Sequence, residues 1–190
     1  MSVLVDGTGK GYRAAVNSDN KLEVDAVSED AYVHAAENGR AFNINTEAVA
    51  YSGTAPFSAG CLYVKNNGLN TLEVVGWFIG EKNDRSGGST TAPLLFEMYG
   101  NPSGTITGTA IEPVNRRIGD SRDFQMTCLK EPTGFTTTGS PLLYQYQYNG
   151  RAFGTVNFAV PPGQAILVTV SSETDSFTAY TGFTGYIGED

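Results

Sequence analysis

The stretch DGTGKG, close to the start of the printed sequence, is the part of the chain that most suggests phosphate chemistry. A glycine-rich loop with a lysine can wrap backbone N–H groups around a phosphate and add a positive charge. The nucleotide-binding loop needs a glycine, four residues, then Gly-Lys and a Ser or Thr whose hydroxyl binds the metal. Here Gly11 follows Gly9-Lys10, and Leu4 occupies the position of the first glycine. The spacing therefore argues against a phosphate loop.

The few groups suited to hydrolytic or zinc chemistry are not paired along the sequence. His34 is the single histidine, and no serine lies in a Gly-x-Ser-x-Gly pattern. A Ser-His-Asp triad or a zinc site with a histidine ligand would have to include His34. We interpret His34 as a surface or packing residue. Two carboxylates across a cleft suffice for glycoside hydrolysis, but nothing pairs any two of Glu73, Glu97 and Glu112. We expect a non-enzymatic protein without cofactors.

Polar stretches also raise the possibility of a calcium site. NSDNKLEVD places oxygen ligands at Asn17, Asp19, Glu23 and Asp25. The helix-flanked calcium loop needs a glycine at its sixth position and a helical context. Leu22 stands at that position, so we interpret the stretch as solvated turns and expect no metal.

The composition is that of a strand-rich, acidic protein. Twenty acids against twelve bases give a formal net charge of −8 over 190 residues. This balance disfavours nucleic-acid binding, which needs a basic face to displace counterions from phosphates. The 23 glycines and the low charged content of 17% favour turns and strands over helices.

Two further features concern the cellular context. Cys61 and Cys128 lie in apolar stretches, and we expect buried thiols, with a disulfide as the alternative. No apolar run approaches about 18 residues, the length that suggests a membrane span, and no charged segment followed by an apolar one opens the sequence. We therefore expect neither a membrane-spanning segment nor a cleaved signal.

Short strand candidates follow one another from Ala41 onward. They are FNINTEAVAYS, GCLYVKN, NTLEVVGWFIGE, PLLFEMYGN, TAIEPVNR, FQMTCLKE, PLLYQYQYN, GTVNFAV, QAILVTVSS and FTAYTGFTGYI. Stretches rich in turn-forming residues separate these candidates: NNGLN, NPSGT, EPTGF, YNGRAF and VPPGQ. This pattern predicts an all-β fold, an antiparallel, jelly-roll-like β-sandwich. The polar stretch 81–93 is either a solvated connection or a binding loop.

The region before Ala41 has a different character. SEDAYVHAAENG is a helix candidate, with Ser28 as cap and Asn38-Gly39 as end. GYRAAVN and KLEVDAV predict a hairpin whose apolar face needs a partner, because two strands alone are marginal in water. We therefore expect an N-terminal arm, hairpin and linker in residues 1–45 and a β-sandwich domain in residues 46–190. The candidate partner contacts in the arm are Lys10, Tyr12, Arg13, Leu22 and Val24.

The stretch LLYQYQYNG contains three tyrosines at strand alternation. Tyr144, Tyr146 and Tyr148 share one face, and two glutamines share the other. Such a row can pack against a core or a neighbouring subunit, with its hydroxyls bonding at the rim. The alternative is a sugar-stacking platform, which would make the protein a carbohydrate-binding module for host glycans.

Several motifs follow one another along the chain in a recognisable order. They are GTGKGYRAAVNSDNKLEVDAV, HAAENGRAFNINT, LYVKNNGLNTLEVVGWFIG, TGTAIEPVNRRIGDS and PPGQAILVTVSSETDSFTAYTGFTGYIGE. Their order resembles that of virion structural proteins of tailed bacteriophages, which occur as small capsid decoration or cement proteins and as related fibre or tail components. The terminal FTGYIGED differs from the Trp-Tyr-Glu-like ending of many such proteins.

The resemblance implies a β-sandwich that assembles as a homo-oligomer, with a trimer favoured, on a capsid or tail lattice. It implies the major capsid protein or other virion proteins as partners, and no nucleic acid or membrane. The expected location is the virion, with the capsid surface favoured, after a period in the host cytoplasm before assembly. A head-fibre, tail or baseplate component is the alternative within the same class.

Overall fold

The computed structural model describes residues 15–16, 22–23, 31–82, 94–148, 151–173 and 176–188. The chain forms two compact units, Met1–Asp30 and Ala31–Asp190. In the first unit, β1 (Ala15–Val16) pairs antiparallel with β2 (Leu22–Glu23). The expected N-terminal hairpin is therefore present.

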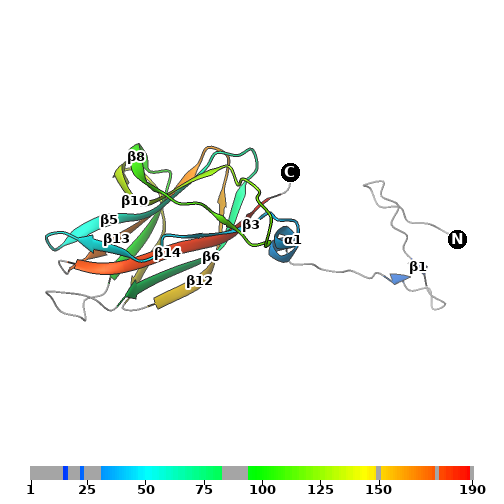
Figure 1. Ribbon diagram of the computed structural model, residues 1–190, viewed down its shortest axis with the longest axis horizontal. Coiled ribbons are helices and arrows are strands. Elements are labelled where there is room, and N and C mark those ends of the chain that lie inside the picture. The colour runs from blue at the N-terminus through cyan, green and yellow to red at the C-terminus, as the bar shows by residue number, and fades with distance from the viewer. Residues whose placement is uncertain are drawn as a thin grey trace. The chain divides into compact units, whose positions relative to one another are not determined.

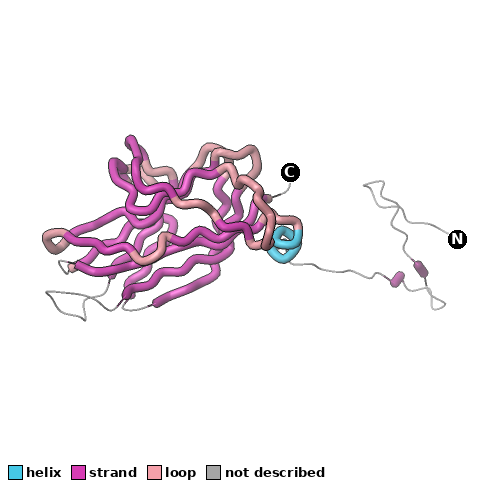
Figure 2. The backbone as a smooth tube through the Cα atoms, viewed as in Figure 1, coloured by secondary structure: helices cyan, strands magenta, loops and turns pink. Residues whose placement is uncertain are grey.

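The second unit is a sandwich of two antiparallel sheets with one short helix (Figures 1 and 2). The first sheet has the order β11 (Leu142–Tyr148), β7 (Leu94–Gly100), β13 (Ala165–Ser172), β5 (Phe57–Asn66), β10 (Met126–Thr136) and β8 (Ser103–Ala110). The second sheet has the order β12 (Arg151–Val160), β6 (Leu72–Lys82), β14 (Ser176–Ile187), β3 (Ala41–Asn45) and β9 (Val114–Asn115), with β4 (Val49–Ser52) also paired to β14. The helix α1 spans Ala31–Glu37.

The connections between strands repeatedly cross from one sheet to the other. The chain passes from β5 to β6 and back to β7, and later from β11 to β12 and back to β13. As a result β13 lies between β5 and β7, which are distant from it in the sequence. The predicted all-β, jelly-roll-like sandwich is confirmed.

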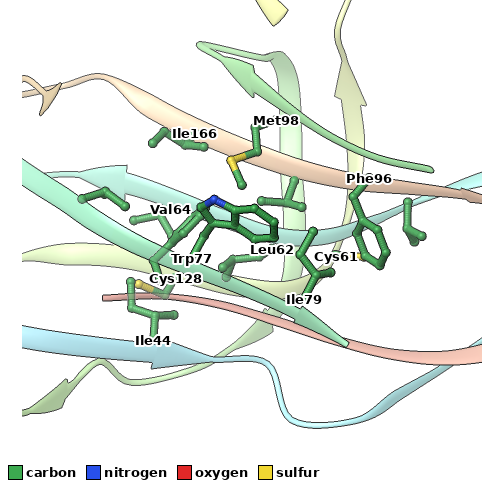
Figure 3. Packing of buried hydrophobic residues seen from close by; sticks show 14 of the residues in the cluster. Ile44, Cys61, Leu62, Val64, Trp77, Ile79, Phe96, Met98, Cys128 and Ile166 are labelled. Atoms are coloured by element: carbon green, nitrogen blue, oxygen red, sulfur yellow. The ribbon is translucent and has the colours of Figure 1, made fainter. Parts of the chain in front are cut away.

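The main core fills the space between the two sheets. Figure 3 shows Trp77 of the second sheet among Leu62, Val64 and Met98 of the first. Strand alternation explains how the sequence supplies this layer: along β7 the residues alternate strictly between buried and half-buried. One face of each such strand therefore covers the core.

A smaller cluster lies on the other side of the first sheet. Tyr63, Ala165 and Leu167 are buried there, packed against Ile106, Leu129 and Phe135. The strands β8 and β10 supply the covering residues. Gly60 permits this close approach, because a Cβ at that position would collide with Pro132 and Phe135. With both faces covered, β13 is buried along nearly its whole length.

The boundary of the sandwich differs from the expected one. We expected the domain to begin at residue 46, but the compact unit begins at Ala31. The reason is tertiary: β3 pairs with β14 over five residue pairs, from Asn45↔Gly182 to Ala41↔Tyr186, and α1 contacts the same two strands. Residues 31–45 are therefore part of the sandwich and not a linker.

Strands extend into two expected turns. In NPSGT, Asn101 and Pro102 connect β7 to β8 as expected, but β8 already begins at Ser103. TAIEPVNR, expected as a strand, retains only the end of β8 and the two-residue β9. EPTGF was also expected as a turn, yet β10 continues through it. Positive φ angles of 52° at Glu131 and 72° at Gly134, with register shifts against β8, accommodate Pro132 within the strand.

The helix ends where the sequence predicts. Within the described residues α1 runs from Ala31 to Glu37, and Ser28, the expected cap, lies outside them. At the C-terminal end the Asn38 side chain donates to the His34 carbonyl at 2.9 Å, and Gly39 has a φ of 67°. A residue with positive φ after the last turn is a common helix stop.

Candidate functional site

The outer face of the second sheet carries a row of aromatic side chains, which we call the aromatic strip: the exposed Phe153 and the half-buried Phe78 and Tyr180. Phe78 lies between the buried Trp77 and Ile79 on β6 and therefore points away from the core. Phe153 of β12 is its direct cross-strand neighbour. The Phe78 and Tyr180 ring centroids are 6.3 Å apart, and Phe153 is 89% exposed.

Glycines on the neighbouring strands create room for these rings. Phe78 faces Gly182 across the β6–β14 pair, and Tyr180 faces Gly80. In both pairs the position of a glycine Cβ is already taken by the opposite aromatic ring. The rings thus lie across the glycines, a cross-strand arrangement that compensates for the missing side chains. The signal in the sequence is the aromatic–glycine alternation in GWFIGE and AYTGFTG, which we did not interpret as a surface.

The aromatic strip reaches an unpaired edge of the sheet. Among the described residues, the strand β12 pairs only with β6, and Arg151 at its first position is the single charge in its sequence RAFGTVNFAV, which contains no Pro. Its register shift lies between Thr155 and Phe158, which leaves the half around Phe153 regular. Edge strands of soluble proteins are commonly protected by charges, prolines or bulges. This half of β12 lacks a bulge and is suited to contact with another chain.

The tyrosine row of β11 has a different role from that of the aromatic strip. Tyr144 and Tyr146 are opposite the buried Met98 and Phe96, so they point into the sandwich. Their ring centroids lie 5.3 and 5.5 Å from that of Trp77. Of the alternatives raised by the sequence, core packing describes the observed contacts of these two rings. Tyr148 pairs with Leu94 at the end of β11, and a subunit or glycan contact through this row stays a prediction.

The candidate acid, base and metal groups are dispersed over the fold. His34 is a half-buried residue in the middle of α1, with its Nε2 atom 3.3 Å from Asn38 Nδ2. Glu73 is on β6, Glu97 is on the outer face of β7 where it accepts a 3.2 Å hydrogen bond from Gln145, and Glu112 is in the segment after β8. Among the described residues, no group of three or more His, Cys, Asp and Glu is arranged to hold a metal ion.

Several sequence candidates fall outside the part of the chain that the structure describes. These are Lys10, Tyr12, Arg13, Val24, the calcium candidates Asn17, Asp19 and Asp25, and residues 83–93 of the polar loop. Leu22 is in β2, paired with Val16. In the described residues, no helix combines the length and the apolar character needed to cross a membrane.

The two cysteines are free and buried, as expected. Burial raises the pKa of Cys61 to about 12, and a hydrogen bond with Tyr51 opposes part of this rise. Burial, followed by the charge of Glu112, raises the pKa of Cys128 to about 12. Both groups are therefore neutral thiols at physiological pH and poor nucleophiles.

We predict that both thiols of the native protein resist a disulfide reagent such as DTNB at pH 8, because the thiolate is the reactive form. In guanidinium chloride both should react at the rate of a model thiol. The free energy of unfolding should fall as the pH rises from about 9 towards 12, because the unfolded chain releases thiol protons that the native chain retains. Rapid labelling of native protein at pH 8 would contradict the prediction.

Comparison with known proteins yields few matches. No protein-family model and no curated protein matches the chain. Among solved structures, the chain is similar to that of infectious bursal virus-derived T=1 particles, with 13% identity over 78% of this chain and 40% of that chain and a TM-score of 0.23. For the Gt strain of infectious bursal disease virus the identity is 13% over 78% of this chain and 41% of that chain, with a TM-score of 0.21. The chain spans less than half of these capsid structures' chains, and TM-scores this low do not establish a shared fold.

Proposed function

We propose that the protein is a non-enzymatic virion structural protein of the capsid decoration or cement type, which binds the head lattice of a tailed bacteriophage as a homo-oligomer, with a trimer favoured. The aromatic strip at the unpaired edge of the second sheet carries this proposal. The Phe153 ring is 89% exposed on an edge strand. Contact of so much apolar surface with water is unfavourable, and burial of the ring against another subunit would anchor a contact. A second copy of the chain is the proposed occupant.

The chemistry of the remaining groups supports a binding role over a catalytic one. The buried thiols are held in the neutral form, and the single histidine is a half-buried residue of α1 beside Asn38. The acidic candidates are dispersed: Glu73 lies on β6, Glu97 on β7 and Glu112 in the segment after β8. Many copies of such a sandwich on one lattice would each contribute weak contacts through their apolar rings. The overall attachment would then be strong because of avidity.

The phage assignment is supported by the order of the sequence motifs, from GTGKGYRAAVN to FTAYTGFTGYIGE. We further propose that the hairpin β1–β2 and its flanking residues attach the sandwich to the major capsid protein by strand addition. Lys10 and Arg13 are cations in a chain of net charge −8, so they are suited to an acidic site on the lattice. The proposed location is the capsid surface.

Deletion of residues 1–27 should abolish attachment to capsids and leave the sandwich folded, because the compact unit Ala31–Asp190 retains its own core. Co-sedimentation of purified protein with undecorated capsids measures attachment, and circular dichroism measures folding. A full-length K10Q/R13Q variant serves as the charge control, and its binding should weaken and become less dependent on salt. Undiminished capsid binding by the truncated chain would refute the attachment arm.

Negative-stain imaging of virions that carry labelled protein locates the protein directly. Labels over the head surface are the expected result. Labels confined to a fibre, tail or baseplate would overturn the decoration assignment and favour the alternative within the same structural class.

A further inference from the structure

A polar pocket opens on the outer face of the first sheet, next to the strands β8 and β10 and separate from the aromatic strip. Its volume is about 540 Å³, within the range of roughly 300–1,000 Å³ typical of small-molecule sites. Its polar lining consists of Tyr63, Lys65, Asn101, Thr127 and Gln164. The apolar lining includes Ile106, Leu129 and Ala165.

The register of three strands builds the floor of the pocket. Lys65 of β5 is opposite Thr127 of β10 and Ala165 of β13. Tyr63, two residues earlier on β5, points to the same face and is opposite Leu129. A tyrosine and a lysine therefore lie side by side on this face of the sheet.

The polar groups around this floor are held by the fold. Asn101 Oδ1 accepts a 2.9 Å hydrogen bond from the Ala165 N–H, and Thr127 Oγ1 accepts one of 2.8 Å from Asn67 Nδ2. The Thr127 hydroxyl consequently keeps its own proton to donate, and the Asn101 amide keeps its N–H groups. Gln164 adds an exposed carboxamide from the turn that precedes β13.

The charge of the pocket is opposite to that of the whole chain. Among the described residues, Lys65 is the one charged side chain in the lining, and none of them contributes a carboxylate to it. Lys65 also forms no ion pair with the described residues, in contrast to Lys130, whose Nζ is 3.9 Å from Glu47 Oε2. In a chain of net charge −8, an ammonium left without a carboxylate is free to bind an anionic group of a ligand.

We propose that this pocket binds a short acidic saccharide, with the sugar carboxylate at Lys65 and the sugar hydroxyls at Thr127, Asn101 and Gln164. Sugar hydroxyls both donate and accept hydrogen bonds, which matches a lining of amides and hydroxyls. The half-buried Ile106 and Leu129 provide apolar surface for the C–H face of a sugar ring, and the buried Tyr63 packs against both of them. A single ammonium balances one carboxylate, and the net negative charge of the protein opposes polyanions such as nucleic acids.

The full-length protein can be tested on an array of sialylated and uronate-containing oligosaccharides, printed beside the same glycans with their carboxylates methyl-esterified. We expect binding to the free acids and at least about tenfold weaker binding to the esters, because the charge-assisted hydrogen bond to Lys65 is lost. Lys65→Met keeps the length and apolar stem of the side chain, and it should lower the affinity by a similar factor. Gln164→Ala, at an exposed turn, should also weaken binding.

Arg122→Gln is the matched control, because Arg122 is exposed and outside the pocket lining. Its binding should equal that of the wild type, and the thermal midpoints of all variants should agree within a few degrees. Failure of every carboxylated glycan to bind, or wild-type affinity in both Lys65→Met and Gln164→Ala, would overturn the proposal. Capsid co-sedimentation by Lys65→Met should be unchanged, which separates this site from the proposed attachment function.

Discussion

Replacement of Phe153 by serine should convert the proposed homo-oligomer into folded monomers. Phe153 is on the edge strand β12, opposite Phe78 of β6, and is 89% exposed. Its ring is therefore the part of the aromatic strip most available to a second copy. Truncation of a central aromatic anchor typically costs about 2 kcal/mol or more, which corresponds to roughly a 30-fold weaker association. Size-exclusion chromatography with light scattering, over a range of protein concentrations, measures the change.

Ile118→Ser and Leu69→Ser are the matched controls for this experiment. Both residues are strongly exposed and apolar, at 102% and 87% exposure, but they lie in connections between strands and not in the aromatic strip. Their oligomeric state should equal that of the wild type. An unchanged oligomer in Phe153→Ser, or a wild-type protein that is monomeric at every concentration, would remove the basis of the proposed subunit contact.

Replacement of Gly182 by alanine should strongly destabilise the sandwich. The added Cβ would occupy space now taken by the Ile44 carbonyl oxygen and the Phe78 ring. The carbonyl belongs to β3, which is paired with β14 at this point, so relief of the clash requires the two strands to separate. Overpacking of this kind costs about 1–3 kcal/mol and occasionally more. Guanidinium denaturation followed by tryptophan fluorescence measures the loss.

Gly76→Ala is the control in the same sheet. Its added Cβ would find its nearest neighbours, the Gly154 oxygen and Thr184 Cβ, at 3.7 Å, an ordinary contact distance. The stability of this variant should be unchanged or higher by up to about 1 kcal/mol, because alanine restricts the unfolded chain. Equal stability of the two alanine variants would contradict the packing described for Gly182.

Much of the fold could be predicted from local pattern, because alternation and turn chemistry act over a few residues. The stretch LLFEMYG forms a strand as expected, with alternating burial, and the N-terminal hairpin pairs as the turn-rich SDN suggests. The errors arose where long-range pairing overrides local preference. NPSGT and EPTGF carry turn residues, yet β8 and β10 pair through them with positive φ angles and register shifts. Likewise, β3 joins the sandwich because β14 supplies its partner.

The candidate sites, like the fold, were predictable from local pattern only in part. The sequence determined that Tyr144, Tyr146 and Tyr148 share a face, that the thiols lie in apolar strands and that no motif pairs a nucleophile with a base. It did not determine which way the tyrosines point, because alternation defines two faces without saying which one is covered. The pairing of β11 with β7 turned Tyr144 and Tyr146 towards Trp77.

Only the tertiary structure brought Phe78, Phe153 and Tyr180 together, since each is on a different strand of the second sheet. The same is true of the pocket at Lys65, whose lining comes from β5, β8, β10 and the turn before β13. Side chains distant in the sequence become neighbours through sheet order, which depends on how the whole set of apolar faces is buried. No short stretch of the chain determines the sheet order, because it depends on contacts between residues distant in the sequence.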